Sequence, residues 1–198
     1  MEMKGEQLVP ASQADTWAAL NDPETLKACI PGCESIERVT DAEYAVRMTA
    51  RVGPVAAKFK GKLTLSDLKP PRSYSIAFEG QGGVAGFGKG GAQVQLAAEG
   101  EATRLSYQVK ASVGGKLAQI GSRLVDAAAR KLADDFFTAF NEKVASLHGA
   151  AAAHEEHGEH LPEPVPRDPD LPDLSFGSLA FFAAGALVVF AVALIVLF

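Results

Sequence analysis

Apolar and polar residues alternate along much of the chain between its amino end and about Val113, in short runs separated by turn residues. Residues 2–9 form the first run, and several more follow from Cys33 onwards. A period of two is typical of β-strands with one buried face. The turn residues predict about six antiparallel strands after the first. These turns are predicted at Thr40-Asp41, Gly53-Pro54, Lys69 to Pro71, Glu79 to Gly91 and Glu99 to Glu101.

The two faces of the predicted sheet differ in polarity. The apolar side consists of Val55, Ala57, Phe59, Leu63 and Leu65; Tyr44, Val46, Met48 and Val52; Tyr74, Ile76 and Phe78; and Leu105, Tyr107, Val109 and Val113. The other side carries Lys58, Lys60 and Lys62, Arg47 and Arg51, Ser73 and Ser75, and Arg104 and Lys110. The basic side is interpreted as a solvated sheet face, or else as a surface for acidic lipid headgroups or a partner protein. The apolar side must be covered by another element.

Helical patterns account for that cover. Ser12 with Asp15 three residues later predicts a helix start, and Asp22-Pro23 begins a second short helix that Pro31-Gly32 ends. A long helix is predicted from Lys116 to about Leu147, where no Pro occurs. Its apolar stripe consists of Leu117, Ile120, Leu124, Leu132, Phe136, Phe140 and Val144. The order of elements predicts an α+β domain in which a curved antiparallel sheet grips this C-terminal helix.

The composition changes after Leu147. Residues 148–173 are rich in Ala, His, Glu and Pro, which predicts a disordered linker. Residues 174–198 contain no charge and exceed the roughly 20 apolar residues of a transmembrane helix. No basic stretch followed by an apolar run opens the chain. We therefore expect a single C-terminal anchor in the cytoplasmic membrane, with the domain of residues 1–147 in the cytoplasm.

Charge and cysteine content narrow the functions that this domain supports. The full chain has a net charge of −5, and residues 148–173 hold seven acidic residues against Arg167 alone. The domain of residues 1–147 is therefore nearly neutral, which gives no reason to expect nucleic acid as a partner. Cys29 and Cys33 are at most half of a zinc site, and two buried thiols are the favoured interpretation.

Two further motifs carry little specific chemistry. Gly86 to Gly91 matches the dinucleotide pattern GxGxxG, but strand alternation resumes at Ala92 where a helix would be needed. A glycine-rich hairpin with bulges and a mobile lip over the interior are both consistent with this stretch. His154, His157 and His160 are spaced to gather a metal, yet a coil gives them no fixed geometry, so no functional metal site is expected.

The distribution of histidine argues against catalysis. All four histidines, including His148, lie in the predicted linker, and the domain has none. General acid–base catalysis often recruits histidine. The acidic residues Asp126, Asp134, Asp135 and Glu142 are typical of the solvated face of the long helix. A binding role, without catalytic residues, is therefore favoured.

Several separated motifs resemble the CoxG family, a group of accessory proteins of carbon monoxide dehydrogenase within the START-like (Bet v 1-like, SRPBCC) helix-grip superfamily. They are Cys29-Ile-Pro-Gly-Cys33, Val52-Gly-Pro54, Phe59-x-Gly61, and Val113 to Leu124 with Phe136-Phe137 beyond. The resemblance covers residues 1–147. It implies a helix-grip fold and an accessory, non-catalytic protein that recruits a molybdenum-containing carbon monoxide dehydrogenase, or a related hydroxylase, to the membrane.

The resemblance also implies an apolar ligand between sheet and helix, and a respiratory quinone (menaquinone or ubiquinone) is the natural cargo. An apolar concave face suits such a prenylated molecule. The predicted lining residues are Phe59, Leu63, Tyr74, Phe78, Phe87, Tyr107, Leu117, Ile120, Leu124 and Phe136. The same pattern is also expected of a packed core. The alternatives are a membrane scaffold or maturation factor without cargo, and, ranked last because the domain lacks histidine, an enzyme resembling polyketide cyclases.

Overall fold

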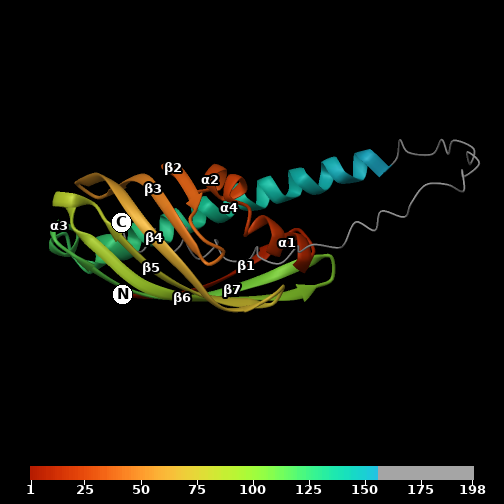
Figure 1. Ribbon diagram of the computed structural model, residues 1–198, viewed down its shortest axis with the longest axis horizontal. Coiled ribbons are helices and arrows are strands. Elements are labelled where there is room, and N and C mark those ends of the chain that lie inside the picture. Colours follow the sequence, from red (N-terminus) through yellow and green to blue (C-terminus); the bar gives the residue numbers. More distant parts are fainter. Residues whose placement is uncertain (156–198) are drawn as a thin grey trace, which may run out of the picture.

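The computed structural model describes the backbone of residues 1–155 and the side chains of residues 1–147. An antiparallel sheet of seven strands curves around one long helix, with shorter helices at both ends (Figure 1). The elements in chain order are β1 (Glu2–Val9), α1 (Gln13–Ala19), α2 (Pro23–Cys29), β2 (Cys33–Arg38), β3 (Glu43–Val52), β4 (Val55–Lys69), β5 (Ser73–Gln81), η1 (Gly83–Ala85), β6 (Phe87–Glu99), β7 (Ala102–Gly114), α3 (Lys116–Gln119) and α4 (Ser122–Glu155).

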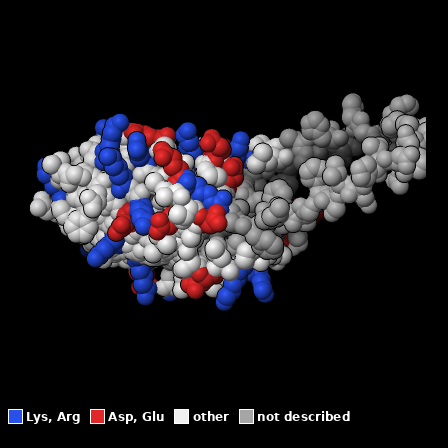
Figure 2. All heavy atoms as spheres, in the orientation of Figure 1, with Lys and Arg blue, Asp and Glu red and all other residues white. Residues whose placement is uncertain are grey.

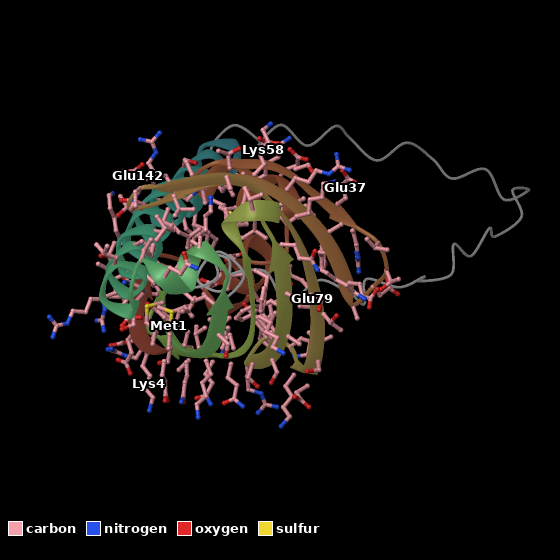
Figure 3. All side chains as sticks on the ribbon, turned by 90° about the vertical axis from the view of Figure 1, so that its left-hand side faces the viewer. Met1, Lys4, Glu37, Lys58, Glu79 and Glu142 are labelled. Carbon is pink, nitrogen blue, oxygen red and sulfur yellow. The ribbon has the colours of Figure 1, made fainter. Side chains whose placement is uncertain are left out.

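The strand order is β1-β7-β6-β5-β4-β3-β2, so consecutive strands from β2 to β7 pair as neighbouring hairpins. β1 pairs with β7, and the two short helices α1 and α2 connect it to β2 at the opposite edge. This topology confirms the predicted α+β helix-grip arrangement. In Figure 3, which looks along the domain from the end that carries α3, α4 closes the open side of the curved sheet.

Both short helices begin where their caps predict. The Ser12 hydroxyl accepts a hydrogen bond from the Asp15 N–H at the start of α1. The Asp22 carboxylate accepts from the Thr25 N–H at 2.9 Å, and Pro23 occupies the first turn of α2, where no N–H is needed. These local bonds satisfy N–H groups that an uncapped helix leaves without partners.

The alternation of the sequence corresponds to the two faces of the sheet. Tyr44, Phe59, Tyr74 and Leu105 are all at most 2 % exposed, whereas Arg47 and the other basic residues of the opposite side are exposed. Burying one apolar face of each strand contributes roughly 25 cal/mol per Å² of apolar area removed from water. The predicted inner and outer sides are therefore confirmed strand by strand.

The glycine-rich stretch is more regular than its sequence predicts. The predicted turn from Glu79 to Gly91 is too long, because β5 continues to Gln81 and β6 already begins at Phe87. Only residues 82–86, which include the single turn η1, connect the two strands. The register pairs Glu79 with Lys89 and Gly80 with Gly88, so most of these glycines are ladder residues.

The C-terminal helix also differs from the single predicted helix. Gly121 has a φ of +92°, and the chain breaks there into the short α3 and the long α4. Because of this break, Leu124 does not continue the stripe of Leu117 and is 50 % exposed. The face of α4 that is buried consists of Val125, Ala129, Ala133, Phe136, Phe137, Phe140 and Val144. α4 also runs beyond Leu147 to Glu155, through alanines 150–153, which have high helix propensity.

The predicted membrane span at residues 174–198 lies outside the described residues, as does most of the predicted linker. Within the described part of the chain, no helix has the length and apolar character needed to cross a bilayer.

Candidate functional site

Three glycines lie side by side on neighbouring strands at the inner face of the sheet. Gly61 of β4 pairs with Gly80 of β5, which in turn pairs with Gly88 of β6. Each occupies a position at which strand alternation would direct a side chain inward. We call these three residues the glycine row. Along it the sheet presents bare backbone to the interior.

Valines stand at both ends of the row. The register places Val46 of β3 beside Gly61, and Val113 of β7 beside Gly88. Val46 is buried and Val113 is half-buried. The glycine row is therefore a local depression in an otherwise apolar strand-to-strand line.

Two phenylalanine rings flank the row along the strand direction. Phe59 lies over Gly82, where an added Cβ would be 2.0 Å from the ring. Phe78 lies over its register partner Gly90, where an added Cβ would be 2.7 Å from Cζ. Since strands rise about 3.4 Å per residue, these two ring-on-glycine pairs are on the order of 13 Å apart, with the glycine row between them.

The helix that covers this part of the sheet also presents small side chains. Val125, Ala129 and Ala133 recur every four residues along α4 and are buried, and Leu117 of α3 is 1 % exposed. On this buried face of α4, aromatic side chains begin only at Phe136. The glycine row and the first turns of α4 thus combine small residues on elements that are distant in the sequence.

The other end of the interior is filled by large aromatic rings. Trp17 of α1 meets Tyr74 edge-on with ring centroids 5.5 Å apart, and Tyr107 stacks on Phe137 at 5.6 Å. Phe136 contacts both Phe137 and Phe140, at 5.2 and 5.5 Å. We call these six residues the aromatic cluster. Contacts of this geometry each add about 0.5–1.5 kcal/mol beyond area burial.

The ten predicted lining residues divide into three groups in the structure. Phe59, Leu63 and Phe78 lie at or next to the glycine row, and Leu117 and half-buried Ile120 lie at the same end. Tyr74, Tyr107 and Phe136 belong to the aromatic cluster instead. Phe87 and Leu124 are 49 % and 50 % exposed. The structure does not bring the last two into the interior, because Phe87 lies against Gly114 and Leu124 follows the break at Gly121.

Sequence reasoning misses the residues that shape the site most. It places Gly80 and Gly88 in a turn, and it assigns Ala129 and Ala133 to no particular face. Their signal is nevertheless present in the sequence. The alternation of Tyr74, Ile76 and Phe78 continues to Gly80, and that of Val94 and Ala92 continues back through Gly90 to Gly88. Following the period of two through the glycines places them on the inner face.

The interior has little capacity for ionisation. The polar residues that are buried are Thr16, Asn21, Thr25 and Thr103, and no charged residue of the described chain joins them. Thr103 donates to the Ala11 carbonyl at 2.8 Å, which satisfies its hydroxyl near α1. Burial raises the pKa of the Tyr44 and Tyr107 hydroxyls, so both stay protonated at neutral pH. The site is suited to holding an uncharged ligand.

The two cysteines are protonated thiols. Burial raises the pKa of Cys29 and of Cys33 to about 11, and neither forms a disulfide. A thiol of such a pKa is a poor metal ligand and nucleophile at neutral pH. Among the residues whose placement is described, no three His, Cys, Asp or Glu side chains gather closely enough to hold a metal ion. The histidines of residues 148–160 lie outside the described side chains.

The basic outer face is partly neutralised by cross-strand pairs. Lys58 bonds Glu34 at 3.0 Å and Lys62 bonds Glu43 at 2.8 Å. An open hollow of about 790 Å³ on this face has Lys62, Lys89 and Glu79 among its lining residues. Figure 2 shows basic and acidic side chains interspersed over the visible part of the domain, and Lys58 points outward in Figure 3. This mixture is typical of a solvated sheet face.

The comparison with known families agrees with the resemblance noted from the motifs. The family model for CoxG of carbon monoxide dehydrogenase matches residues 5–145, which is most of the chain. The chain belongs to the CoxG family. The family suggests an accessory subunit associated with carbon monoxide dehydrogenase. No curated protein sequence matches the chain.

Solved structures show the same fold. A conserved protein from Geobacillus kaustophilus is 31 % identical with a TM-score of 0.70, over 74 % of this chain and 96 % of its own. A protein from Thermus thermophilus is 18 % identical with a TM-score of 0.57, over 74 % and 99 %. The Zhui aromatase/cyclase from Streptomyces sp. R1128 is 14 % identical with a TM-score of 0.56, over 73 % and 93 %.

These structures place the CoxG domain among Bet v 1-like, helix-grip folds. At 14 % identity the likeness to the cyclase concerns the fold alone. The Geobacillus kaustophilus protein aligns over nearly its whole length, so a related chain folds with little beyond this domain.

Proposed function

We propose that this CoxG-family chain is a non-catalytic accessory subunit of a molybdenum-containing carbon monoxide dehydrogenase, or of a related hydroxylase. It binds a respiratory quinone, menaquinone or ubiquinone, on the inner face of its sheet. It also recruits the enzyme to the cytoplasmic membrane. The observation that carries the proposal is the glycine row between Phe59 and Phe78, in a family associated with this dehydrogenase.

A quinone head is flat and uncharged, which matches three properties of the site. Bare backbone at the glycine row allows a planar ring to approach the sheet closely. The rings of Phe59 and Phe78 offer apolar surfaces and edges for offset contacts. The absence of buried charge within the described residues avoids a desolvation cost when the ligand enters.

Membrane attachment supplies the reason for carrying such a ligand. Quinones reside in the bilayer, whereas the enzyme that must reduce them works from the aqueous side. The predicted anchor at residues 174–198 would hold the carrier beside its ligand's reservoir. Electron transfer chemistry itself would remain with the dehydrogenase and the quinone.

The test uses residues 1–147 purified without the predicted anchor, since the Geobacillus kaustophilus structure supports independent folding of this domain. Organic extraction followed by mass spectrometry identifies any lipid that co-purifies. Titration with a short-chain quinone, followed by native mass spectrometry, measures stoichiometry. We expect one quinone per domain. Circular dichroism confirms that the domain is folded.

A folded domain that retains no lipid and binds no added quinone would contradict the carrier role. If the same domain still captured the dehydrogenase, the result would favour the scaffold or maturation factor. The full-length chain serves as the matched control for ligands that need the predicted anchor.

A further inference from the structure

An uncharged apolar surface lies at the end of the domain that carries α3. Val84 of η1 is 85 % exposed, Phe87 is 49 % exposed and Leu124 is 50 % exposed. We call these three residues the apolar tip. Large apolar side chains gathered on one surface mark an interaction site more often than scattered ones do.

Contacts within the chain bring the tip residues to the same end. η1 packs against α3 and β4, and an added Cβ at Gly115 would be 2.5 Å from the Gly86 Cα. Leu124 approaches the turn between β3 and β4, with its Cδ1 3.9 Å from the Cβ position of Gly53. In Figure 1 α3 marks this end, on the left of the domain, and Figure 3 views the domain from it.

The charges around the tip are all of one sign. Residues 51–57, 81–88 and 113–125 form this end and include Arg51, Lys116 and Arg123 but no Asp or Glu. All three basic side chains are exposed, and none has an acidic partner among the described residues. We call them the basic rim. It differs from the outer face, where Lys58 and Lys62 are paired.

We infer that the apolar tip inserts into an anionic lipid bilayer surface while the basic rim contacts the lipid headgroups. Basic residues near an anionic leaflet each contribute attraction, and exposed apolar side chains add burial in the interfacial region. A protein partner would more often provide a mixed polar rim with both signs of charge. The inference is independent of any quinone cargo and of the dehydrogenase.

The length of chain that follows α4 is compatible with this orientation. α4 starts beside the tip and, with 34 residues at about 1.5 Å each, ends roughly 51 Å away. Residues 156–173 number 18 and reach at most ~60 Å when fully extended. The tip and the predicted anchor can therefore contact one bilayer together. In that orientation the glycine row, close to the η1 connection on both β5 and β6, lies near the lipid.

The test places a tryptophan at the tip of the full-length chain. The Phe87→Trp variant is mixed with vesicles of phosphatidylglycerol and phosphatidylcholine whose acyl chains carry bromine, which quenches indole fluorescence at short range. The native Trp17 is buried and gives a constant background measured on the unmodified chain. The matched control is Leu68→Trp, at a position that is also exposed but lies at the far end of β4.

We expect bromine to quench the indole of the Phe87→Trp variant but not that of the Leu68→Trp variant, and we expect the effect to weaken in vesicles of phosphatidylcholine alone. Replacing Arg51, Lys116 and Arg123 by Gln lowers the equilibrium constant for tip insertion by on the order of fivefold per residue. The same number of substitutions at exposed Lys4, Lys60 and Lys110 controls for net charge. About 1 M salt, where the Debye length falls to ~3 Å, reduces quenching in the same way.

The inference is overturned if the Phe87→Trp chain sediments with the vesicles while its introduced indole stays unquenched, because the chain would then be held by another part. It is also overturned if the two variants are quenched equally. Neither outcome bears on quinone binding by residues 1–147, which has its own test. A folded domain that binds quinone but shows no quenching at position 87 would separate the two proposals.

Discussion

The two ends of the interior differ in the size of the side chains that fill them. At the end covered by α1, the aromatic cluster packs six large rings between the sheet and α4. At the end covered by α3, the glycine row presents backbone, and α4 presents alanines. The same strands and the same helix serve both ends, so the difference is encoded along each element rather than between elements.

Three elements show this gradient from large to small residues. The inward positions, read from the aromatic cluster towards the glycine row, are Tyr74, Ile76, Phe78 and Gly80 on β5; Leu96, Val94, Ala92, Gly90 and Gly88 on β6; and Phe140, Phe136, Ala133 and Ala129 on α4. Large rings provide most of the burial that stabilises a small domain. The gradient therefore separates the residues that stabilise the fold from those that shape the candidate site.

Removing a ring from the aromatic cluster should have the largest effect on stability. Phe136 is fully buried and contacts two other rings, so Phe136→Ala leaves a cavity that the fixed sheet and helix cannot close. We expect a loss of about 3–5 kcal/mol in the free energy of unfolding, measured by urea denaturation of residues 1–147. Phe87→Ala, at the half-exposed surface, is the control and should change stability by only about 0.5 kcal/mol. Equal losses would contradict the assignment of Phe136 to the stabilising end.

Filling the glycine row should change binding more than stability. Gly61→Leu places a side chain between Phe59 and the inner side of Gly80, where we propose that the quinone ring lies. We expect quinone affinity to fall at least about tenfold, which corresponds to roughly 1.4 kcal/mol. Stability should change by less than about 1 kcal/mol, because Leu suits a strand better than Gly does. Titration calorimetry and urea denaturation measure the two effects separately.

A glycine at the opposite end provides the matched comparison. An added Cβ at Gly5 of β1 would be 2.3 Å from the Tyr107 hydroxyl, and the Tyr107 ring is held by its stack on Phe137. Gly5→Ala should therefore lower stability by about 1–3 kcal/mol while leaving quinone affinity unchanged. If Gly61→Leu instead destabilised the protein as much as Gly5→Ala, the glycine row would be part of a filled core, and the contrast between the ends would fail.

The sequence predicts the fold well because local and global signals agree. Alternation identifies the inner face of each strand, and the caps at Ser12 and Asp22 fix where the short helices begin. The predicted helix-grip architecture is confirmed by the strand order and by the relatives of known structure. Each of these features depends on residues that are close in the sequence, or on a regular period.

The site is less predictable, because glycine has two opposite meanings. It is the usual residue of turns, yet in β5 and β6 it occupies ladder positions that only the cross-strand register reveals. Gly121 is the reverse case: a single positive φ breaks an apparently continuous helical stripe and turns Leu124 outward. Neither outcome follows from periodicity alone, since both depend on contacts with distant parts of the chain.

The smallest effect is expected at the cap of α2, which packs against α4 away from the glycine row. Partial burial works to raise the pKa of Asp22, but hydrogen bonds from the Thr25 hydroxyl and N–H outweigh it and lower the pKa. Because the folded pKa is lowered, this carboxylate stabilises the fold above the unfolded pKa of about 3.9. That contribution is lost as the pH falls through the folded value.

Asp22→Ala should lower the free energy of unfolding by about 1 kcal/mol at neutral pH. The difference from the unmodified chain should shrink below about pH 4, because protonation removes the same acceptor from the original residue. Asp22→Asn keeps a capping acceptor without titrating, so its stability should be nearly independent of pH across this range. Urea denaturation at several pH values measures all three chains. A deficit for Asp22→Ala that stayed constant into strong acid would show that the carboxylate charge contributes nothing, and unchanged quinone affinity would confirm that this cap acts apart from the glycine row.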